Sequence, residues 1–389
     1  MIYCGFLMAL TGFTIDIMLP GFSQIALELD APMQRVQESI SIFALCFGFA
    51  QIIYGPASDK YGRRPIIAIG MGIFIIGAII SMFAQDIATL LIGRGLQGFG
   101  GAAAPVLARA LLRDTHSGTE LAMAMATSMA IFSFGPIVAP LLGIFIIDSF
   151  NWRVVFVFIC AFAFILLLFD IYILKETNRN KNPNALKPRV IWSSISTIVR
   201  HPQSRYFILC ASIAYCALFS YISNSPVIYE SAFGVTGFAF AAMFAFTGLG
   251  IIIGQMVNRA LLPKLGVMKM LRVSSFILLI ASVGVGLLSY LELLNAYNFT
   301  ALMFFFNTSF LAVISNTASL TIDPHPNLAG ITSAFYGGVT NGIAAVFIAA
   351  TFALIGGDIQ IWAWVMMATT GLTVLALWAV KPSSIEFSK

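Results

Sequence analysis

Two ionisable side chains, Asp16 and Arg94, stand deep inside long apolar stretches of this sequence. A charge in apolar surroundings is costly to bury, so each needs a partner, water or a function. Asp16 falls in the stretch 2–23 and Arg94 in the stretch 87–110. At about 1.5 Å per helical residue, Asp16 lies ~20 Å along its stretch, and Arg94 lies ~10 Å along a stretch that runs the opposite way. Because the hydrocarbon core of a membrane is about 30 Å thick, both side chains would lie ~10 Å from the same surface.

This pair could exchange a proton, because an ionised Asp16 would hold Arg94 and a protonated Asp16 would release it. The alternative is a fixed buried ion pair that only secures helix packing. A third ionisable residue, Asp170, stands near the end of its apolar stretch beside Lys175, so we expect it at a membrane surface.

The elements that must position these residues are apolar helices. The chain is 59% hydrophobic and 10% charged, whereas about a quarter of the residues in a soluble domain are charged. Its apolar stretches have the length of membrane-crossing helices, which need about 20 residues each. They fall at 2–23, 35–57, 66–84, 87–110, 119–147, 153–174, 206–229, 237–258, 269–291, 298–322, 327–355 and 359–380. The sequence predicts an all-α integral membrane protein with twelve transmembrane helices.

A polar stretch divides these helices into six and six, which predicts two six-helix bundles, 1–174 and 206–389, joined by a cytoplasmic connector, 175–205. Lys and Arg are strongly segregated between alternate loops. Eighteen lie on one side, including Arg179, Lys381 and Lys389, and only Arg35 and Arg153 lie on the other. This bias predicts that both termini are cytoplasmic.

Several function classes fit poorly. The formal charge of +5 is spread over short loops and forms no basic face, which argues against nucleic acid as a partner. The five cysteines and three histidines have no metal-ligand spacing, and the sequence contains no nucleophile–base pair or phosphate-binding loop. We therefore expect no metal, no cofactor and no enzyme activity, and a membrane-embedded enzyme or sensor is the disfavoured alternative.

The loop between the second and third stretches carries a specific motif: Gly55, Asp59, Gly62, Arg63 and Arg64. Its glycines permit a tight turn, and Asp59 with Arg63 can form a switchable charge cluster at two helix ends. A solvated charged turn is the alternative. The motif resembles the signature of the major facilitator superfamily, which implies that the cluster latches a gate. A degenerate echo at Gly254, Asn258, Arg259 and Gly266 fits two related halves.

Two further motifs narrow the resemblance. The segment around Arg94 and Gln97 is similar to the superfamily's helix 4 arginine motif. A second group resembles the helix 5 motif of its antiporters, although Ala139 departs from the usual pattern; it comprises Gly135, Pro136, Ala139, Pro140 and Gly143. Prolines and glycines there permit a kink and close helix contact, but both residue types are common in membrane helices. Thr14–Pro20 and Tyr221–Pro226 resemble the bicyclomycin-resistance branch of the drug:proton antiporters.

The resemblance implies a monomeric transporter in the bacterial inner membrane that exports small organic molecules in exchange for protons by alternating access. Multidrug efflux and antibiotic resistance would follow. Its partners would be a small organic substrate, protons and the lipid bilayer. A proton-coupled symporter importing a metabolite and a dedicated siderophore or metabolite exporter remain alternatives. Candidate cavity residues, which could equally bond neighbouring helices, are Gln97, Tyr215, Tyr221, Asn224, Asn307, Asn316, Tyr336 and Asn341.

Overall fold

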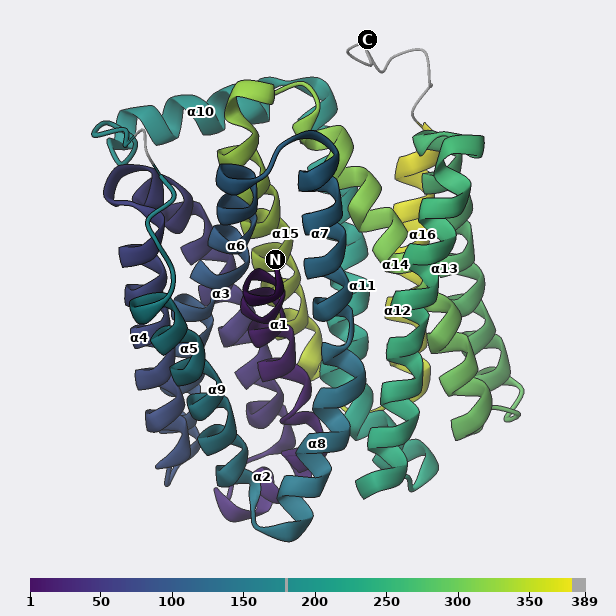
Figure 1. The fold of residues 1–389 in the computed structure, drawn as a ribbon. Helices are drawn as coiled ribbons and strands as arrows, with labels where there is room; N and C mark the ends of the chain where they lie inside the picture. The colour runs from purple at the N-terminus through teal and green to yellow at the C-terminus, as the bar shows by residue number, and fades with distance from the viewer. Residues whose placement is uncertain (179–180, 380–389) are drawn as a thin grey trace. The chain divides into compact units, whose positions relative to one another are not determined.

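The structure, a computed structural model, describes residues 1–178 and 181–379, and every regular element in these ranges is a helix (Figure 1). The all-α prediction is confirmed. Three residues used above to orient the chain, Arg179, Lys381 and Lys389, lie outside the described ranges.

The helices follow one another through short turns. Those up to residue 172 are α1 (Ile2–Asp16), the 3-10 turn η1 (Leu19–Gly21), α2 (Phe22–Glu28), α3 (Met33–Tyr61), α4 (Arg63–Met82), α5 (Ile87–Gly101), α6 (Ala103–Thr115), α7 (Gly118–Ser133), α8 (Gly135–Ser149) and α9 (Trp152–Tyr172). Those after it are α10 (Pro188–Arg200), α11 (Pro202–Phe233), α12 (Gly237–Leu265), α13 (Val267–Tyr290), α14 (Ala296–Ile322), the 3-10 turn η2 (Pro326–Leu328), α15 (Ala329–Ile355) and α16 (Ile359–Ala379).

Eleven stretches of the described residues are long and apolar enough to cross a membrane. They match eleven of the predicted stretches, with ends that agree to within five residues except that the stretch predicted to end at 258 continues to Leu265. The remaining one, 87–110, corresponds to α5 and α6, which contain 15 and 13 residues and are separated by Ala102. Twelve crossings therefore stay a prediction.

Prolines account for three interruptions within the predicted helices. A proline has no N–H to donate to the carbonyl four residues earlier. Pro20 leaves the carbonyl of Asp16 without this donor, and α1 ends at Asp16. Pro105 likewise leaves the carbonyl of Gly101 without a donor, and α5 ends at Gly101. Pro136 leaves the carbonyl of Phe132 without a donor, next to the end of α7 at Ser133. Each break thus occurs at a position where a backbone hydrogen bond is impossible.

The chain forms two compact units. The first contains Met1–Thr197 and Gly330–Gly342, and the second contains Ile198–Ala329 with the described part of Ile343–Lys389. In the first unit α4 packs between α5 and α9, and α3 packs against α5. In the second, α14 packs against α11, α12 and α13, and α16 packs against α11 and α13. Buried aromatic residues form both cores, such as Phe43 and Trp152 in the first unit and Phe299 and Trp362 in the second.

The connector differs from the polar stretch expected over 175–205, because it contains the helix α10 (Figure 1). Apolar residues recur along this helix at Ile191, Ile195 and Ile198, with Trp192 and Val199 beside them. This spacing places them on one face of a helix. The polar composition of the surrounding segment hid the helix from the sequence analysis.

Candidate functional site

Asp16 and Arg94 are both buried in the first unit. Asp16 is the last residue of α1 and is 5% exposed, while Arg94 lies in the middle of α5 and is fully buried. Arg94 Nη1 donates to Gln97 Oε1 at 2.8 Å, one turn further along α5, and at 3.4 Å to the carbonyl of Thr14 in α1. The guanidinium lies 4.7 Å from the centre of the Phe43 ring. Gln97, which belongs to the same motif, therefore contacts the arginine.

The ion pair expected between Asp16 and Arg94 is absent from the described residues. Arg94 Nε and Nη2 are buried and have no hydrogen-bond partner among the described residues. The guanidinium instead contacts Gln97 and the Thr14 carbonyl through Nη1, and it lies over the Phe43 ring. A buried cation with two unused donors is costly, and it is therefore suited to receive an anionic group.

The helix 5 motif lies against this site. Gly143 of α8 packs so closely on the chain just after Asp16 that a Cβ there would stand 2.1 Å from the carbonyl oxygen of Ile17. Only glycine permits this approach. Ala139 and Pro140 are buried in the same helix, which begins at Gly135–Pro136. The motif thus lets α8 pack against the break in α1 where Asp16 lies.

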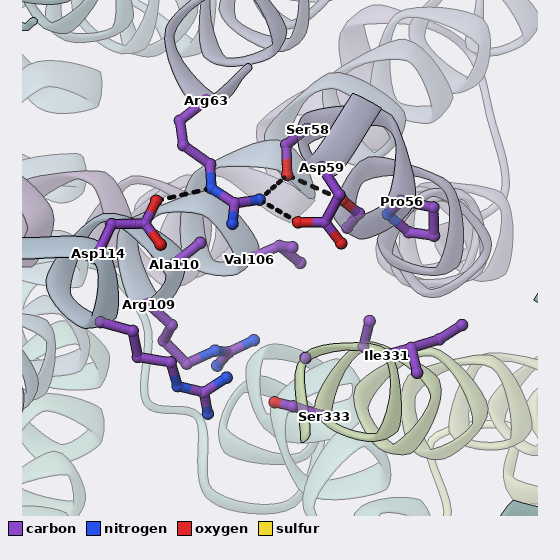
Figure 2. A pocket seen from close by; sticks show the side chains of 14 residues that line it. Pro56, Ser58, Asp59, Arg63, Val106, Arg109, Ala110, Asp114, Ile331 and Ser333 are labelled. Atoms are coloured by element: carbon purple, nitrogen blue, oxygen red, sulfur yellow. Dashed lines mark hydrogen bonds and ion pairs between the residues drawn. The ribbon is translucent and has the colours of Figure 1, made fainter. Parts of the chain in front are cut away.

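The 55–65 loop forms a second site in the first unit (Figure 2). Arg63 lies between two carboxylates: Nη1 donates to Asp59 Oδ1 at 2.6 Å, and Nε donates to Asp114 Oδ2 at 2.9 Å. Nη1 also donates to Ser58 Oγ at 2.7 Å, and this hydroxyl donates to the carbonyl of Gly55. The predicted Asp59–Arg63 pair is present, and Asp114 at the end of α6 completes it.

The first residues of the connector hold the same loop. Glu176 accepts hydrogen bonds from the backbone N–H groups of Arg63 and Arg64 at 2.9 and 3.2 Å, and so caps the N-terminus of α4. Gly62 has φ +112°, and a Cβ there would stand 2.4 Å from Glu176 Oε2. Both the backbone conformation and the close carboxylate require glycine at this turn. The glutamate was not predicted, although the exposed N–H groups of a helix start always require an acceptor.

Further connector contacts surround Asp59 and Asp114. Asn178 Nδ2 donates to the carbonyl of Asp59 at 3.1 Å, and Thr177 Oγ1 donates to Asp114 Oδ2 at 2.9 Å. A hollow of about 100 Å³ adjoins the cluster. Figure 2 shows Arg109 on one side of it and Ile331 and Ser333 of α15 across from Asp59. The charged side chains of the loop therefore bond to one another and to the connector, although the Asp59 side chain is half exposed.

Arg64 points away from this cluster toward α9. Its Nε donates at 3.1 Å to the carbonyl of Asp170, and its Nη2 donates to the carbonyl of Ile171. The Asp170 side chain is fully buried within the protein, and its expected place near a membrane surface stays a prediction. Neither of its carboxylate oxygens has a hydrogen-bond partner among the described residues.

Several candidate cavity residues connect helices of the second unit. Tyr221 Oη of α11 and Thr247 Oγ1 of α12 lie 2.9 Å apart, and Asn307 Nδ2 of α14 donates to the carbonyl of Thr247 at 3.2 Å. Asn316 Nδ2 donates to Asn258 Oδ1 at 3.0 Å, which joins α14 to α12. These contacts hold helices together, and a role in binding substrate stays a prediction.

The other candidates are also within helices. Asn224 and Asn341 donate to carbonyls one turn earlier in their own helices. The Tyr215 ring lies 5.5 Å from that of Phe310, and Tyr336 of α15 is buried in the first unit. Gly266, part of the echo of the 55–65 motif, has φ +76° at the α12–α13 turn, as Gly62 has at the α3–α4 turn. The two halves therefore share a turn that needs glycine.

The described residues contain no group of three or more His, Cys, Asp or Glu side chains that could hold a metal ion.

The sequence matches the Major Facilitator Superfamily over residues 2–349. This chain belongs to that superfamily. As a member it is a membrane transporter and not an enzyme, and the resemblance that its motifs suggested is confirmed.

Two curated relatives of this superfamily member are informative. The bicyclomycin resistance protein homolog of Haemophilus influenzae is 27% identical over 342 residues, which cover 88% of this chain and 86% of that protein. The multidrug resistance protein MdtL of Escherichia coli is 30% identical over 233 residues, which cover 60% of this chain and 59% of MdtL. The matched segment thus spans less than two thirds of MdtL. The similarity to the bicyclomycin-resistance branch is confirmed.

Solved structures show the same fold. The D-xylose-proton symporter has a TM-score of 0.81 at 14% identity, with 98% of this chain and 97% of that chain covered. The human organic anion transporter MFSD10 (TETRAN) has a TM-score of 0.71 at 17% identity, with 97% of each chain covered. The major facilitator fold expected from the motifs is therefore confirmed.

Proposed function

We propose that this transporter exports drug-like small organic molecules from bacteria in exchange for protons. The observation that carries the proposal is a buried carboxyl, Asp16, and a buried guanidinium, Arg94, that form no ion pair among the described residues of the first unit. The names of two relatives, a bicyclomycin resistance protein homolog and a multidrug resistance protein, support export of such compounds. In the proposed topology the chain crosses the inner membrane twelve times, has both termini in the cytoplasm and works as a monomer.

In the proposed mechanism Asp16 takes up a proton from outside, while Arg94 and Gln97 respond to its charge. The absence of an ion pair between Asp16 and Arg94 among the described residues is what we expect when Asp16 is protonated, because a neutral carboxyl does not attract the guanidinium. Loss of the proton gives Arg94 Nε and Nη2 an anion to bind. A unit charge in a low-dielectric site is large enough to shift an equilibrium between inward-facing and outward-facing states.

Replacing one carboxyl oxygen tests this mechanism. Asp16→Asn keeps the size and burial of the side chain but cannot ionise, so proton-driven export should be lost while the amount of protein in the membrane stays unchanged. Asp148→Asn, which changes an exposed carboxyl at the end of α8, is the matched control. Drug susceptibility of an efflux-deficient host should return to the vector level for Asp16→Asn only, with bicyclomycin included in the panel. An unimpaired Asp16→Asn variant would remove Asp16 from the mechanism.

The direction of coupling distinguishes an exporter from a symporter that imports a metabolite. Liposomes that contain the purified protein are given a compound from the susceptibility panel on both sides of the bilayer. Their lumen is then made alkaline, so that protons flow inward. An antiporter moves the compound against the proton flow, whereas a symporter moves it with the flow. Movement in the same direction as protons would contradict export by exchange, and response to siderophores or metabolites alone would indicate a dedicated exporter.

A further inference from the structure

A groove of about 400 Å³ lies on the second unit between one end of α13 and the last turns of α16. These two helices pack side by side. The lining residues are Leu265, Lys269, Arg272, Val273, Phe276, Ile277 and Trp378. None of them takes part in the sites described above.

The groove follows one face of α13. Lys269, Arg272, Val273, Phe276 and Ile277 are spaced at i, i+3, i+4, i+7 and i+8, which is the spacing of a single helical stripe. The two cations lie near the N-terminus of α13, and the three apolar residues follow toward the middle of the helix. At about 1.5 Å per residue the stripe is ~12 Å long, which is less than half the thickness of the hydrocarbon core.

The side chains of this stripe are open to the surroundings. Val273 and Phe276 are each 49% exposed, and Trp378 is 56% exposed. The Arg272 guanidinium lies 5.5 Å from the centre of the Trp378 ring, so it is held at the edge of the groove. An exposed groove on a candidate membrane span, with cations at one end and apolar walls beyond them, matches a molecule with an anionic head and a hydrocarbon tail.

The local charge strengthens this match. Arg259 and Lys264 stand at the end of α12 next to the turn that leads to Lys269, and residues 231–291 contain no Asp or Glu. The cations of this turn are therefore not neutralised by acidic residues from their own two helices. Basic pockets between membrane helices attract anionic lipid headgroups.

We propose that this groove is a binding site for an anionic phospholipid. The phosphate binds Lys269 and Arg272, and one acyl chain lies along Val273, Phe276 and Ile277 against Trp378. Other anions lack the apolar tail that the lower half of the groove fits, and zwitterionic lipids carry no net charge for the two cations to attract. The site is separate from Asp16 and Arg94, so it does not depend on the proposed function.

Trp378 provides a direct readout. The purified protein is placed in bilayers that contain equal fractions of brominated phosphatidylglycerol or brominated phosphatidylcholine, and quenching of tryptophan fluorescence is measured. The chain has five tryptophans, so the quenching that disappears in Trp378→Phe is assigned to the groove. We expect this component to show a higher relative association constant for the anionic lipid.

Charge-neutral variants locate the headgroup. Lys269→Gln and Arg272→Gln should each lower the preference for the anionic lipid about fivefold, which corresponds to ~1 kcal/mol per cation. Lys264→Gln, which removes an equal charge from the end of α12 but does not line the groove, should lower the preference much less than either groove variant does.

Three results would overturn the site. The first is equal quenching of Trp378 by the two lipids. The second is a loss of preference in Lys264→Gln as large as in Lys269→Gln, which would reveal only a diffuse surface potential. The third is an unchanged preference in both groove variants, which would mean that Lys269 and Arg272 merely extend toward the aqueous surface.

Discussion

Arg63 shares its guanidinium between two carboxylates of unequal exposure, and this inequality leads to a quantitative prediction. The Asp114 side chain is 20% exposed and the Asp59 side chain is 51% exposed, while Arg63 itself is 12% exposed. A hydrogen bond to a charged group that is largely shielded from water contributes about 1.5–3 kcal/mol. A solvent-exposed ion pair contributes about 0.2–1 kcal/mol.

We therefore expect Asp114→Asn to lower the free energy of unfolding by ~1–2 kcal/mol more than Asp59→Asn does. Both aspartates lie in the last turn of a helix, where a negative charge is unfavourable, so this helix-dipole contribution cancels in the comparison. The shorter distance to Asp59 would suggest the opposite order. The prediction thus separates the effect of solvent exposure from the effect of distance.

The assay is a pair of double-mutant cycles with Arg63→Gln, measured by equilibrium unfolding of the purified protein in mixed micelles. The coupling energy should be larger for Arg63–Asp114 than for Arg63–Asp59. Arg63→Lys provides a control for charge alone, because a lysine cannot present the planar fork that reaches both carboxylates. A larger coupling energy for Arg63–Asp59 would refute the reasoning.

Two other changes test contacts of the first unit. Glu176→Gln should lower the free energy of unfolding by about 1 kcal/mol, because an amide oxygen carries no charge at the start of α4; thermal unfolding measures it. Gly143→Ala should cost about 1–3 kcal/mol and reduce export, because α8 must move away from Ile17; Gly72→Ala, where a Cβ has free space, is the control.

His325, between α14 and α15, makes stability depend on pH. Its burial, aided by the nearby His201, lowers the pKa of the imidazole below its ordinary value of 6.5. Below pH 6.5 the unfolded chain therefore binds more protons than the folded one, so stability falls as the pH falls. This loss should be smaller in His325→Gln when unfolding is measured between pH 7 and pH 5, and an equal loss would exclude His325 as its source.

Much of the fold could be predicted because membrane helices are written as local hydrophobic runs. The helix ends agree to within a few residues for most spans, since a charged or glycine-containing turn marks each one. The breaks after Asp16 and before Gly135 were also foreseeable from Pro20 and Pro136. In contrast, α10 was missed because its apolar stripe is short and lies within a polar segment.

The sites were predictable only in part, for a related reason. Residues that carry a motif, such as Asp59 and Arg63, lie four positions apart and can be paired from helical geometry. Asp114 and Glu176 reach the same cluster from positions 51 and 113 residues away from Arg63, so no local pattern connects them. The ion pair expected between Asp16 and Arg94 is absent among the described residues, and depth along a helix could not have shown this. Matching depths did not reveal that Gln97 and Phe43 contact the guanidinium.

The connector contacts bear on the gating role that the motif predicts for the 55–65 loop. Glu176 holds the backbone at the start of α4, Thr177 bonds Asp114, and Asn178 bonds the carbonyl of Asp59. The N–H of Asn182 also donates to that carbonyl at 2.9 Å. Since these bonds join the loop and Asp114 to residues 176–178 and 182, the loop cannot rearrange unless those residues move with it or several hydrogen bonds break together. If the cluster latches a gate, as its motif predicts, that gate is coupled mechanically to the connector, and a change in the connector should alter it without touching the motif.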